Sequence, residues 1–135
     1  MTETPKTIYL AGPMQGYPSF NYPAFAQAAA YLRSFGHRVF SPAERDKERH
    51  GGADISAGNV TGDVKKAEQD HGFSLRAALA DDTDFICMEA DTIALLPGWE
   101  HSKGAFAEWA LAKALGHDIM YLVAEEYADE RSVAA

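Results

Sequence analysis

Residues 92–116 read TIALLPGWEHSKGAFAEWALAKALG. A short apolar segment (92–95) leads into a glycine-containing loop, and an alanine- and leucine-rich segment follows. This order predicts a buried strand, a loop and then a helix whose N-cap is Ser102. Gly104 in the first turn leaves backbone N–H groups accessible, and Glu108 lies about one and a half turns into the helix. A carboxylate beside an open helix N-terminus, at the carboxyl end of a strand, predicts a functional site in an open α/β sheet.

The same two patterns alternate along the rest of the chain. Apolar runs bounded by turn residues predict strands at 7–11, 37–40, 92–96 and 118–123. Helical spacing of apolar residues predicts helices over about 23–35 and 103–115. Strands that alternate with helices indicate an α/β fold, with a parallel sheet of four to five strands and helices on both faces.

The segment 43–71 interrupts this pattern. It is polar, contains glycines and shows no sustained period, so we expect a long loop or insertion that is a lid, a subunit contact or a partly disordered excursion. Short helices are expected after it, one capped by Ser74 over 75–80 and one started by Asp81 or Asp82 over 85–90.

Composition narrows the class of protein. With 135 residues, of which 47% are hydrophobic, the chain fits one globular domain over 1–135 with frayed ends at 1–5 and from 124. The net charge of −8 argues against duplex nucleic acid as a partner, although helix N-termini still bind small anions. No apolar run approaches the ~20 residues of a membrane span, so a soluble, cytoplasmic protein is expected. The single cysteine, Cys87, is expected to be a buried, inert thiol.

The segment 43–71 is rich in acidic residues and histidines, but their spacing is not that of a metal site. Scattered polar side chains in a loop are usually solvated, so neither a metal nor another cofactor is expected. The chain also lacks a P-loop, a G-x-G-x-x-G motif and a G-x-S-x-G motif. The polar residues concerned are Glu44, Asp46, Glu48, His50, Asp54, Asp63, Asp70 and His71.

Three separate motifs resemble the nucleoside 2-deoxyribosyltransferase superfamily. They are Tyr9-Leu10-Ala11-Gly12-Pro13-Met14, Asp91 before the third strand, and Ser102-x-Gly104-x-x-x-Glu108. Their order and spacing match from about residue 7 to residue 123, apart from 43–71. The closer likeness is to a small branch of phage and bacterial proteins of unassigned function, which share the run Pro-Gly-Trp-Glu-x-Ser-x-Gly-Ala at 97–105. The resemblance implies a flavodoxin-like, Rossmann-like three-layer domain that acts on the N-glycosidic bond of deoxynucleosides or their 5′-monophosphates.

The resemblance also implies catalytic roles. Glu108 takes the position of the nucleophile that attacks C1′ of the deoxyribose, and Tyr9 that of a tyrosine at the catalytic centre. Ser102 takes the position of a serine that binds the 5′-phosphate in nucleotide-hydrolysing members. Asp82 is the better match for an aspartate that assists at the sugar or base, with Asp84 as the fallback.

The first loop carries the substrate-binding residues that the resemblance implies. Gly12 and Met14 close the first strand, and Tyr17, Phe20 and Asn21 lie where family members contact the base. In the nucleotide-hydrolysing members, a serine and an arginine of this loop bind the phosphate. Here the corresponding residues are Pro13 and Gln15, which weakens the phosphate assignment.

Each assignment has a structural alternative. Without the resemblance, Glu108 reads as a helix-surface glutamate, Tyr9 as an ordinary strand aromatic and Ser102 as a cap. Gly98 and Gly104 suit a substrate site, and close backbone packing also explains both. Trp99 is interpreted as a wall of the pocket and Asp91 as a structural residue.

We therefore expect an enzyme that cleaves an N-glycosidic bond, either as a hydrolase or as a transferase to a second base. The short chain and the retained Ser102 favour the hydrolase. One alternative is a catalytically silent nucleotide-binding module, in which Glu108 binds a ribose hydroxyl. Another is a cytokinin-type phosphoribohydrolase, whose run Pro-Gly-Gly-x-Gly-Thr-x-x-Glu is loosely similar to residues 97–108. The expected partner in each case is a small-molecule nucleoside or nucleotide.

A homodimer or larger homo-oligomer is also expected, with 43–71 over or beside the neighbour's site. Related members commonly assemble in this way. The predicted helix 103–115 is apolar nearly all round, more than the single stripe that a small domain needs to bury. The apolar residues are Phe106, Trp109, Ala110, Leu111, Ala114 and Leu115.

Overall fold

A parallel four-stranded sheet forms the centre of the computed structural model, which describes residues 4–128. Its strands run in the order β2-β1-β3-β4, and the predicted α/β fold is confirmed. The strands are β1 (Thr7–Ala11), β2 (Arg38–Phe40), β3 (Thr92–Leu95) and β4 (Asp118–Tyr121). The helices are α1 (Tyr22–Arg33), α2 (Pro42–Arg49), α3 (Val64–His71), α4 (Leu75–Met88), α5 (Lys103–Leu115) and α6 (Ala124–Tyr127), with short 3₁₀ turns η1 (Pro18–Asn21) and η2 (Trp99–His101).

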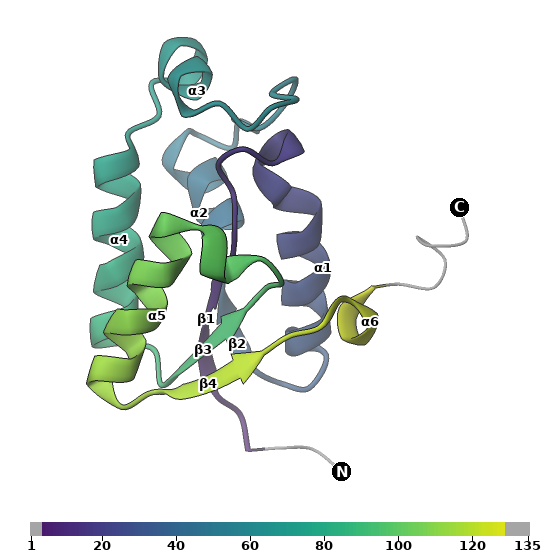
Figure 1. Ribbon diagram of the computed structural model, residues 1–135, viewed down its shortest axis with the longest axis vertical. Coiled ribbons are helices and arrows are strands. Elements are labelled where there is room, and N and C mark those ends of the chain that lie inside the picture. Colours follow the sequence, from purple (N-terminus) through teal and green to yellow (C-terminus); the bar gives the residue numbers. More distant parts are fainter. Residues whose placement is uncertain (1–3, 129–135) are drawn as a thin grey trace.

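Helices cover both faces of the sheet, which makes three layers (Figure 1). Successive residues of a strand point to opposite faces, so Ile8 and Leu10 of β1 pack with α1 while Tyr9 and Ala11 pack with α4 and α5. Tyr9 is 1% exposed. The pleat of β1 therefore directs the Tyr9 side chain into the layer that also contains the motif helix.

The elements around the motif agree with the sequence prediction. β1 and α5 have the expected bounds, and β3 ends one residue earlier than expected. Ser102 caps α5, since its hydroxyl accepts a hydrogen bond from the Ala105 N–H at 3.2 Å. Gly116 ends the helix in the left-handed conformation that glycine favours.

The prediction of a loop over 43–71 is wrong, because this segment contains α2 and α3. Apolar periodicity misses both helices, since their stabilising groups are polar. The helix α2 starts at Pro42. Ion pairs from its Arg45 and Arg49 to Asp81 hold α2 against α4. Asp63 caps α3 by accepting from the Lys65 N–H, and Gly72 ends it in a left-handed conformation.

The two short helices expected over 75–80 and 85–90 are one continuous helix, α4. Ser74 caps it as predicted, by accepting from the Ala77 N–H at 3.1 Å. Asp81 and Asp82 lie in its middle and start no new helix. Arginine side chains from α2 pair with Asp81 there, so the carboxylates do not interrupt the helix.

Two further expectations need correction. Residues 124–127 form α6, which contacts α1, so the chain does not fray at residue 124. The rest of the expected tail and most of the frayed start lie outside the described residues. Cys87 is in a helix, as expected, but it is exposed rather than buried because it lies on the outer face of α4. No helix in residues 4–128 has the length and apolar character needed to cross a membrane.

Candidate active site

A cavity of about 300 Å³ lies where the loop after β1 meets α4 and α5, beneath the segment 43–71. This is the carboxyl edge of the sheet, where open α/β proteins bind ligands. Residues from the first loop, α2, α3, α4 and α5 all contribute to its walls. They are Tyr9, Gly12, Met14, Gln15, Phe20, Pro42, Asp46, Ile55, Val64, Phe73, Leu75, Ala78, Leu79, Asp82, His101, Ser102, Lys103, Gly104, Ala105 and Glu108.

Glu108 lies at the inner end of this cavity and is 5% exposed. The Tyr9 hydroxyl donates to its Oε2 atom at 2.7 Å. Burial raises the pKa of Tyr9, so the phenol keeps its proton and remains a donor. The hydrogen bond fixes the orientation of the carboxyl group. Glu108 is therefore a held, buried carboxyl group and not a helix-surface glutamate.

Asp82 of α4 lies in the same cavity wall and is also 5% exposed. Its Oδ1 atom is buried and has no hydrogen-bond partner within residues 4–128. A buried acceptor without a partner is costly unless a ligand or water reaches it. Asp82 thus offers a hydrogen-bonding atom to whatever occupies the cavity.

Burial makes both carboxyl groups hold their protons more tightly than usual. The pKa of Glu108 rises from 4.5 to about 8, because burial disfavours the charge more than the Tyr9 hydrogen bond stabilises it. The pKa of Asp82 rises from 3.8 to about 7, again mainly through burial. Two acids with pKa values near neutrality in one cavity are typical of proton-transfer sites.

The N-terminus of α5 forms a second wall. Ser102, Lys103 and Gly104 line the cavity there, with His101 from the preceding turn. The first turn of a helix presents backbone N–H groups and a partial positive charge, which attract anions. Ser102 already uses its hydroxyl as a cap, so the predicted cap is confirmed and a phosphate contact stays a prediction.

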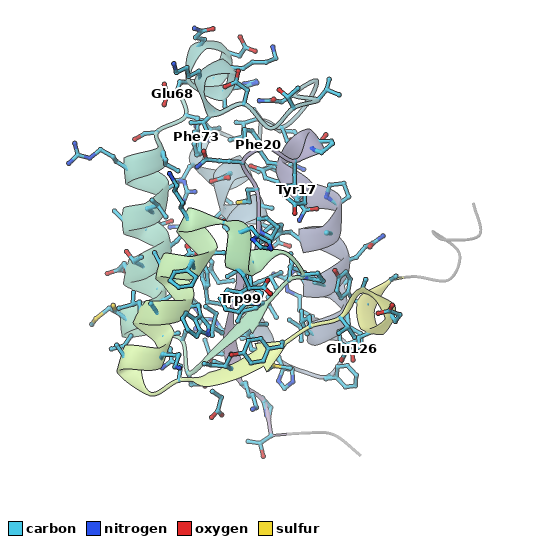
Figure 2. All side chains as sticks on the ribbon, in the orientation of Figure 1. Tyr17, Phe20, Glu68, Phe73, Trp99 and Glu126 are labelled. Atoms are coloured by element: carbon cyan, nitrogen blue, oxygen red, sulfur yellow. The ribbon has the colours of Figure 1, made fainter. Side chains whose placement is uncertain are left out.

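A further wall of the cavity is apolar. Phe20 and Phe73 stack with their ring centroids 6.5 Å apart, and Figure 2 shows them together below α3. Ile55 and Val64 extend this wall. An aromatic and aliphatic wall of this kind suits a planar, apolar ring of a ligand.

Backbone contacts attach the segment 43–71 to the first loop. The Gly16 N–H donates to the Gly62 carbonyl at 3.0 Å, and the Ser19 N–H donates to the Asn59 carbonyl at 2.8 Å. A Cβ on Gly62 would lie 2.4 Å from the Tyr17 carbonyl oxygen, so this close approach requires glycine. Asp46, Ile55 and Val64 of this segment line the cavity of its own chain, whereas its action as a lid and its place beside a neighbouring subunit stay predictions.

Eight of the predicted site residues line the cavity. They are Tyr9, Gly12, Met14, Phe20, Asp82, Ser102, Gly104 and Glu108. Gly12 is small for a structural reason, since a Cβ there would lie 2.7 Å from the Cβ of Leu96. Asp91, interpreted as structural, accepts from the Thr7 N–H and from the Thr92 hydroxyl.

Trp99 does not form a wall of this cavity. Its ring lies 5.1 Å from that of Trp109 on α5 and 6.0 Å from that of Tyr121 on β4. The interpretation as a pocket wall is wrong because α5 and β4 offer it an aromatic surface outside the site.

Four other predicted binding residues also lie away from the cavity lining. Tyr17 packs against Gly98, whose Cβ position would be 2.9 Å from the Tyr17 hydroxyl. Asn21 stabilises the first loop, because its side-chain amide donates to the Pro13 carbonyl at 3.1 Å. Asp84 is exposed on α4, two residues past Asp82 and on a different side of the helix.

Sequence reasoning missed Asp46, which lines the cavity and is 5% exposed. The Tyr22 hydroxyl donates to its Oδ2 atom at 2.7 Å. Phe73, Ile55 and Val64 were also missed. Ser41-Pro42 before a run of charges indicates a helix start and was the signal that could have placed Asp46 on a helix.

Among residues 4–128, no group of three or more His, Cys, Asp or Glu side chains is arranged to hold a metal ion.

These features define a small α/β protein with a buried, carboxyl-rich candidate active site at the carboxyl edge of its sheet. Residues 6–121 match the domain of unknown function DUF4406, so the chain belongs to that family. The expected likeness to a family of unassigned function is thereby confirmed. No curated protein and no solved structure matches the chain. Membership of the nucleoside 2-deoxyribosyltransferase superfamily stays a prediction.

Ser102→Ala separates capping from phosphate binding. Loss of a cap lowers the free energy of unfolding by roughly 0.5–2 kcal/mol. Loss of a phosphate contact in addition raises KM for a 5′-monophosphate and leaves KM for the matching nucleoside unchanged. Ser74→Ala is the matched control, since Ser74 caps α4 in the same way and does not line the cavity. Equal changes in KM for both substrates would leave Ser102 as a cap alone.

Proposed function

We propose that this protein cleaves the N-glycosidic bond of a deoxynucleoside or deoxynucleoside 5′-monophosphate, with Glu108 as the nucleophile. The observation that carries the proposal is the buried Tyr9–Glu108 pair, with Asp82 in the same 300 Å³ cavity. A buried carboxyl group held at 2.7 Å by a tyrosine and open to a cavity is poorly explained by stability alone, because its burial disfavours the charged form.

The chemistry resembles that of retaining glycosidases. The Glu108 carboxylate attacks C1′, the C1′–N bond breaks, and its electron pair leaves with the base. Asp82 supplies the proton that the departing base nitrogen takes up. Water then hydrolyses the glycosyl ester and releases the sugar, or a second base attacks C1′ and the protein acts as a transferase.

The walls of the cavity fit the parts of such a substrate. A base would lie against Phe20 and Phe73, while the sugar would reach Glu108 and Asp82 at the inner end. The N-terminus of α5, with Ser102 and Lys103, faces the same cavity and suits a 5′-phosphate or 5′-hydroxyl. The segment 43–71 covers the site and limits the access of water to the reacting atoms.

The pH dependence follows from the two raised pKa values. The productive state has an ionised Glu108 and a protonated Asp82. It is the less populated arrangement of one proton over the pair, because Glu108 has the higher pKa. Below about pH 7 both groups hold protons, and above about pH 8 neither does. We expect kcat/KM to pass through a maximum between pH 7 and 8 and to fall on both sides. A profile that is flat from pH 5 to 9 would contradict this assignment.

A chromatographic screen for free base tests the proposed function directly. The purified protein is incubated with the common deoxynucleosides and their 5′-monophosphates, with Glu108→Gln as the blank. Release of base by the wild type and not by the variant supports the proposal. Binding of a nucleotide without any release would favour the silent binding module, and release only from ribonucleotides would favour a phosphoribohydrolase.

We also propose a homodimer or larger homo-oligomer that buries the aromatic face of α5. Phe106 is 49% exposed and Tyr121 is 57% exposed, beside Trp99 and Trp109. Light scattering at micromolar concentration should give at least twice the 14.7 kDa chain mass. Phe106→Glu should shift the protein to the monomer, whereas Met88→Glu on the exposed face of α4 should not. A wild-type monomer would overturn the proposal.

A further inference from the structure

Arg49 connects three aspartates around the inner end of the cavity. It lies in the last turn of α2, and its side chain is 20% exposed. Its guanidinium bonds Asp46 of the same helix and Asp81 of α4, the latter at 2.6 Å. The same group lies 3.9 Å from Oδ1 of Asp82, which is the buried oxygen atom without a hydrogen-bond partner.

We propose that Arg49 is a positioning residue of this site, which sets the charge of Asp82 from outside the cavity. Arg49 does not line the cavity, so it acts through Asp82 and not on a ligand. The expected effect of Arg49 on the pH profile of kcat/KM rests on the proposed function. The electrostatic coupling between Arg49 and Asp82 is independent of that function.

The groups that face Asp82 explain why this cation matters. Tyr9 of β1 and Glu108 of α5 lie on one side, with Asp46 and Arg49 of α2 on another and Asp81 next to it on α4. Three of these neighbours are carboxyl groups, and each favours a proton on Asp82. Arg49 lies at ion-pair distance and is the neighbour whose charge opposes them.

Its anchoring makes Arg49 a fixed charge. The planar guanidinium meets Asp46 and Asp81 with separate nitrogen atoms, and both contacts are at least partly buried. Asp46 is itself held by the Tyr22 hydroxyl at 2.7 Å. The guanidinium therefore keeps its place near Oδ1 of Asp82 without bonding to it, and that oxygen stays available for a ligand.

The contacts of Arg49 also link the segment 43–71 to Asp82. Arg49 belongs to the segment that continues into Ile55 and Val64 of the apolar wall, and it pairs with α4, which carries Asp82. A displacement of α2 would move the cation away from Asp82. The protonation of the acid thus depends on the position of the segment that closes the site.

Arg45 provides a matched control within the same helix. It bonds Asp81 at 2.7 Å, as Arg49 does, but it contacts neither Asp46 nor Asp82 in the described structure. Arg45→Gln and Arg49→Gln each remove one cation from Asp81. The two variants differ because only Arg49→Gln removes the cation that pairs with Asp46 and lies 3.9 Å from Asp82.

The test is a ¹³C NMR titration of the Asp82 carboxyl carbon in the ligand-free protein. An opposite charge at this distance lowers the pKa of a carboxyl group by roughly 1–3. We expect Arg49→Gln to raise the Asp82 midpoint by about one pH unit or more, and Arg45→Gln to move it by less than about 0.3. If Arg49→Gln does not fold, Arg49→Lys is used. A single ammonium group cannot keep both anchors, so we expect that variant to raise the midpoint by about half a pH unit.

The result that overturns the proposal is an Asp82 midpoint that does not move in the folded Arg49 variant, or that moves equally in the Arg45 variant. The titration needs no substrate, so an inactive wild type would overturn the proposed function alone. Where the wild type releases base, the acid limb of kcat/KM in Arg49→Gln should move upward with the Asp82 midpoint, because the group with the lower pKa sets that limb. A general loss of structure would lower activity without moving that limb.

Discussion

Glu108→Gln is expected to abolish base release, with kcat at least about a thousandfold below the wild type. The amide keeps the shape of the side chain and can still accept the hydrogen bond from Tyr9, which the wild type makes at 2.7 Å. It cannot form an ester with C1′. Activity is expected to be lost because the proposed nucleophile is missing, while the volume of the core and the fold should be unchanged. Base release by liquid chromatography and the far-UV circular dichroism spectrum check both halves of this expectation.

Glu100→Gln is the matched control, because Glu100 lies in the exposed turn just before α5. It makes the same chemical change in the same part of the chain and should leave kcat unchanged. Retention of more than about a tenth of the wild-type kcat in Glu108→Gln, a barrier change under ~1.4 kcal/mol, would remove Glu108 from the catalytic role. The roles proposed for Tyr9 and Asp82 in the reaction would then also be wrong.

The part of the molecule that the sequence predicts best is the part with strong local signals. Apolar runs with sharp glycine or proline ends define β1 and β3, and Ser102 and Gly116 mark both ends of α5. Once a parallel sheet is assumed, the carboxyl ends of these strands meet at one edge. That assumption places Glu108 and Tyr9 in the same site, and the 2.7 Å hydrogen bond agrees with it.

The part that the sequence does not predict depends on contacts between distant polar groups. α2 buries Asp46 and directs Arg45 and Arg49 to Asp81, some 32 to 36 residues away. A charged run of this kind looks solvated until its partners are known. The same pairs explain why Asp81 and Asp82 continue α4 and do not start a new helix.

Trp99 illustrates a different limit. A loop position beside a glycine indicates a ligand contact, but a tryptophan ring packs wherever apolar surface is nearest. Phe106, Trp109 and Tyr121 supply that surface on the outer side of α5. Only the direction of the η2 turn decides between the two sides, and local sequence does not determine that direction.

The second large effect concerns the pH dependence of stability. Glu108 has a pKa of about 8 in the folded protein and an ordinary value of 4.5, so the folded state binds its proton more tightly than the unfolded chain does. The free energy of unfolding therefore falls as the pH rises from about 4.5 to 8. Asp82 contributes in the same direction, because its pKa rises from 3.8 to about 7. The wild type should be most stable in mildly acidic solution.

Glu108→Gln removes the larger of these two contributions. At about 1.4 kcal/mol for each pKa unit, the ionisation of Glu108 costs the folded state of the order of 5 kcal/mol above pH 8. Chemical denaturation should therefore show a variant that matches the wild type near pH 4.5 and is several kcal/mol more stable above pH 8. Glu100→Gln should follow the wild type throughout. An inactive variant with this gain in stability would show that the Glu108 carboxylate is needed for activity although it lowers the free energy of unfolding. A variant with no gain at high pH would show that Glu108 is ionised at little cost, and its raised pKa would be contradicted.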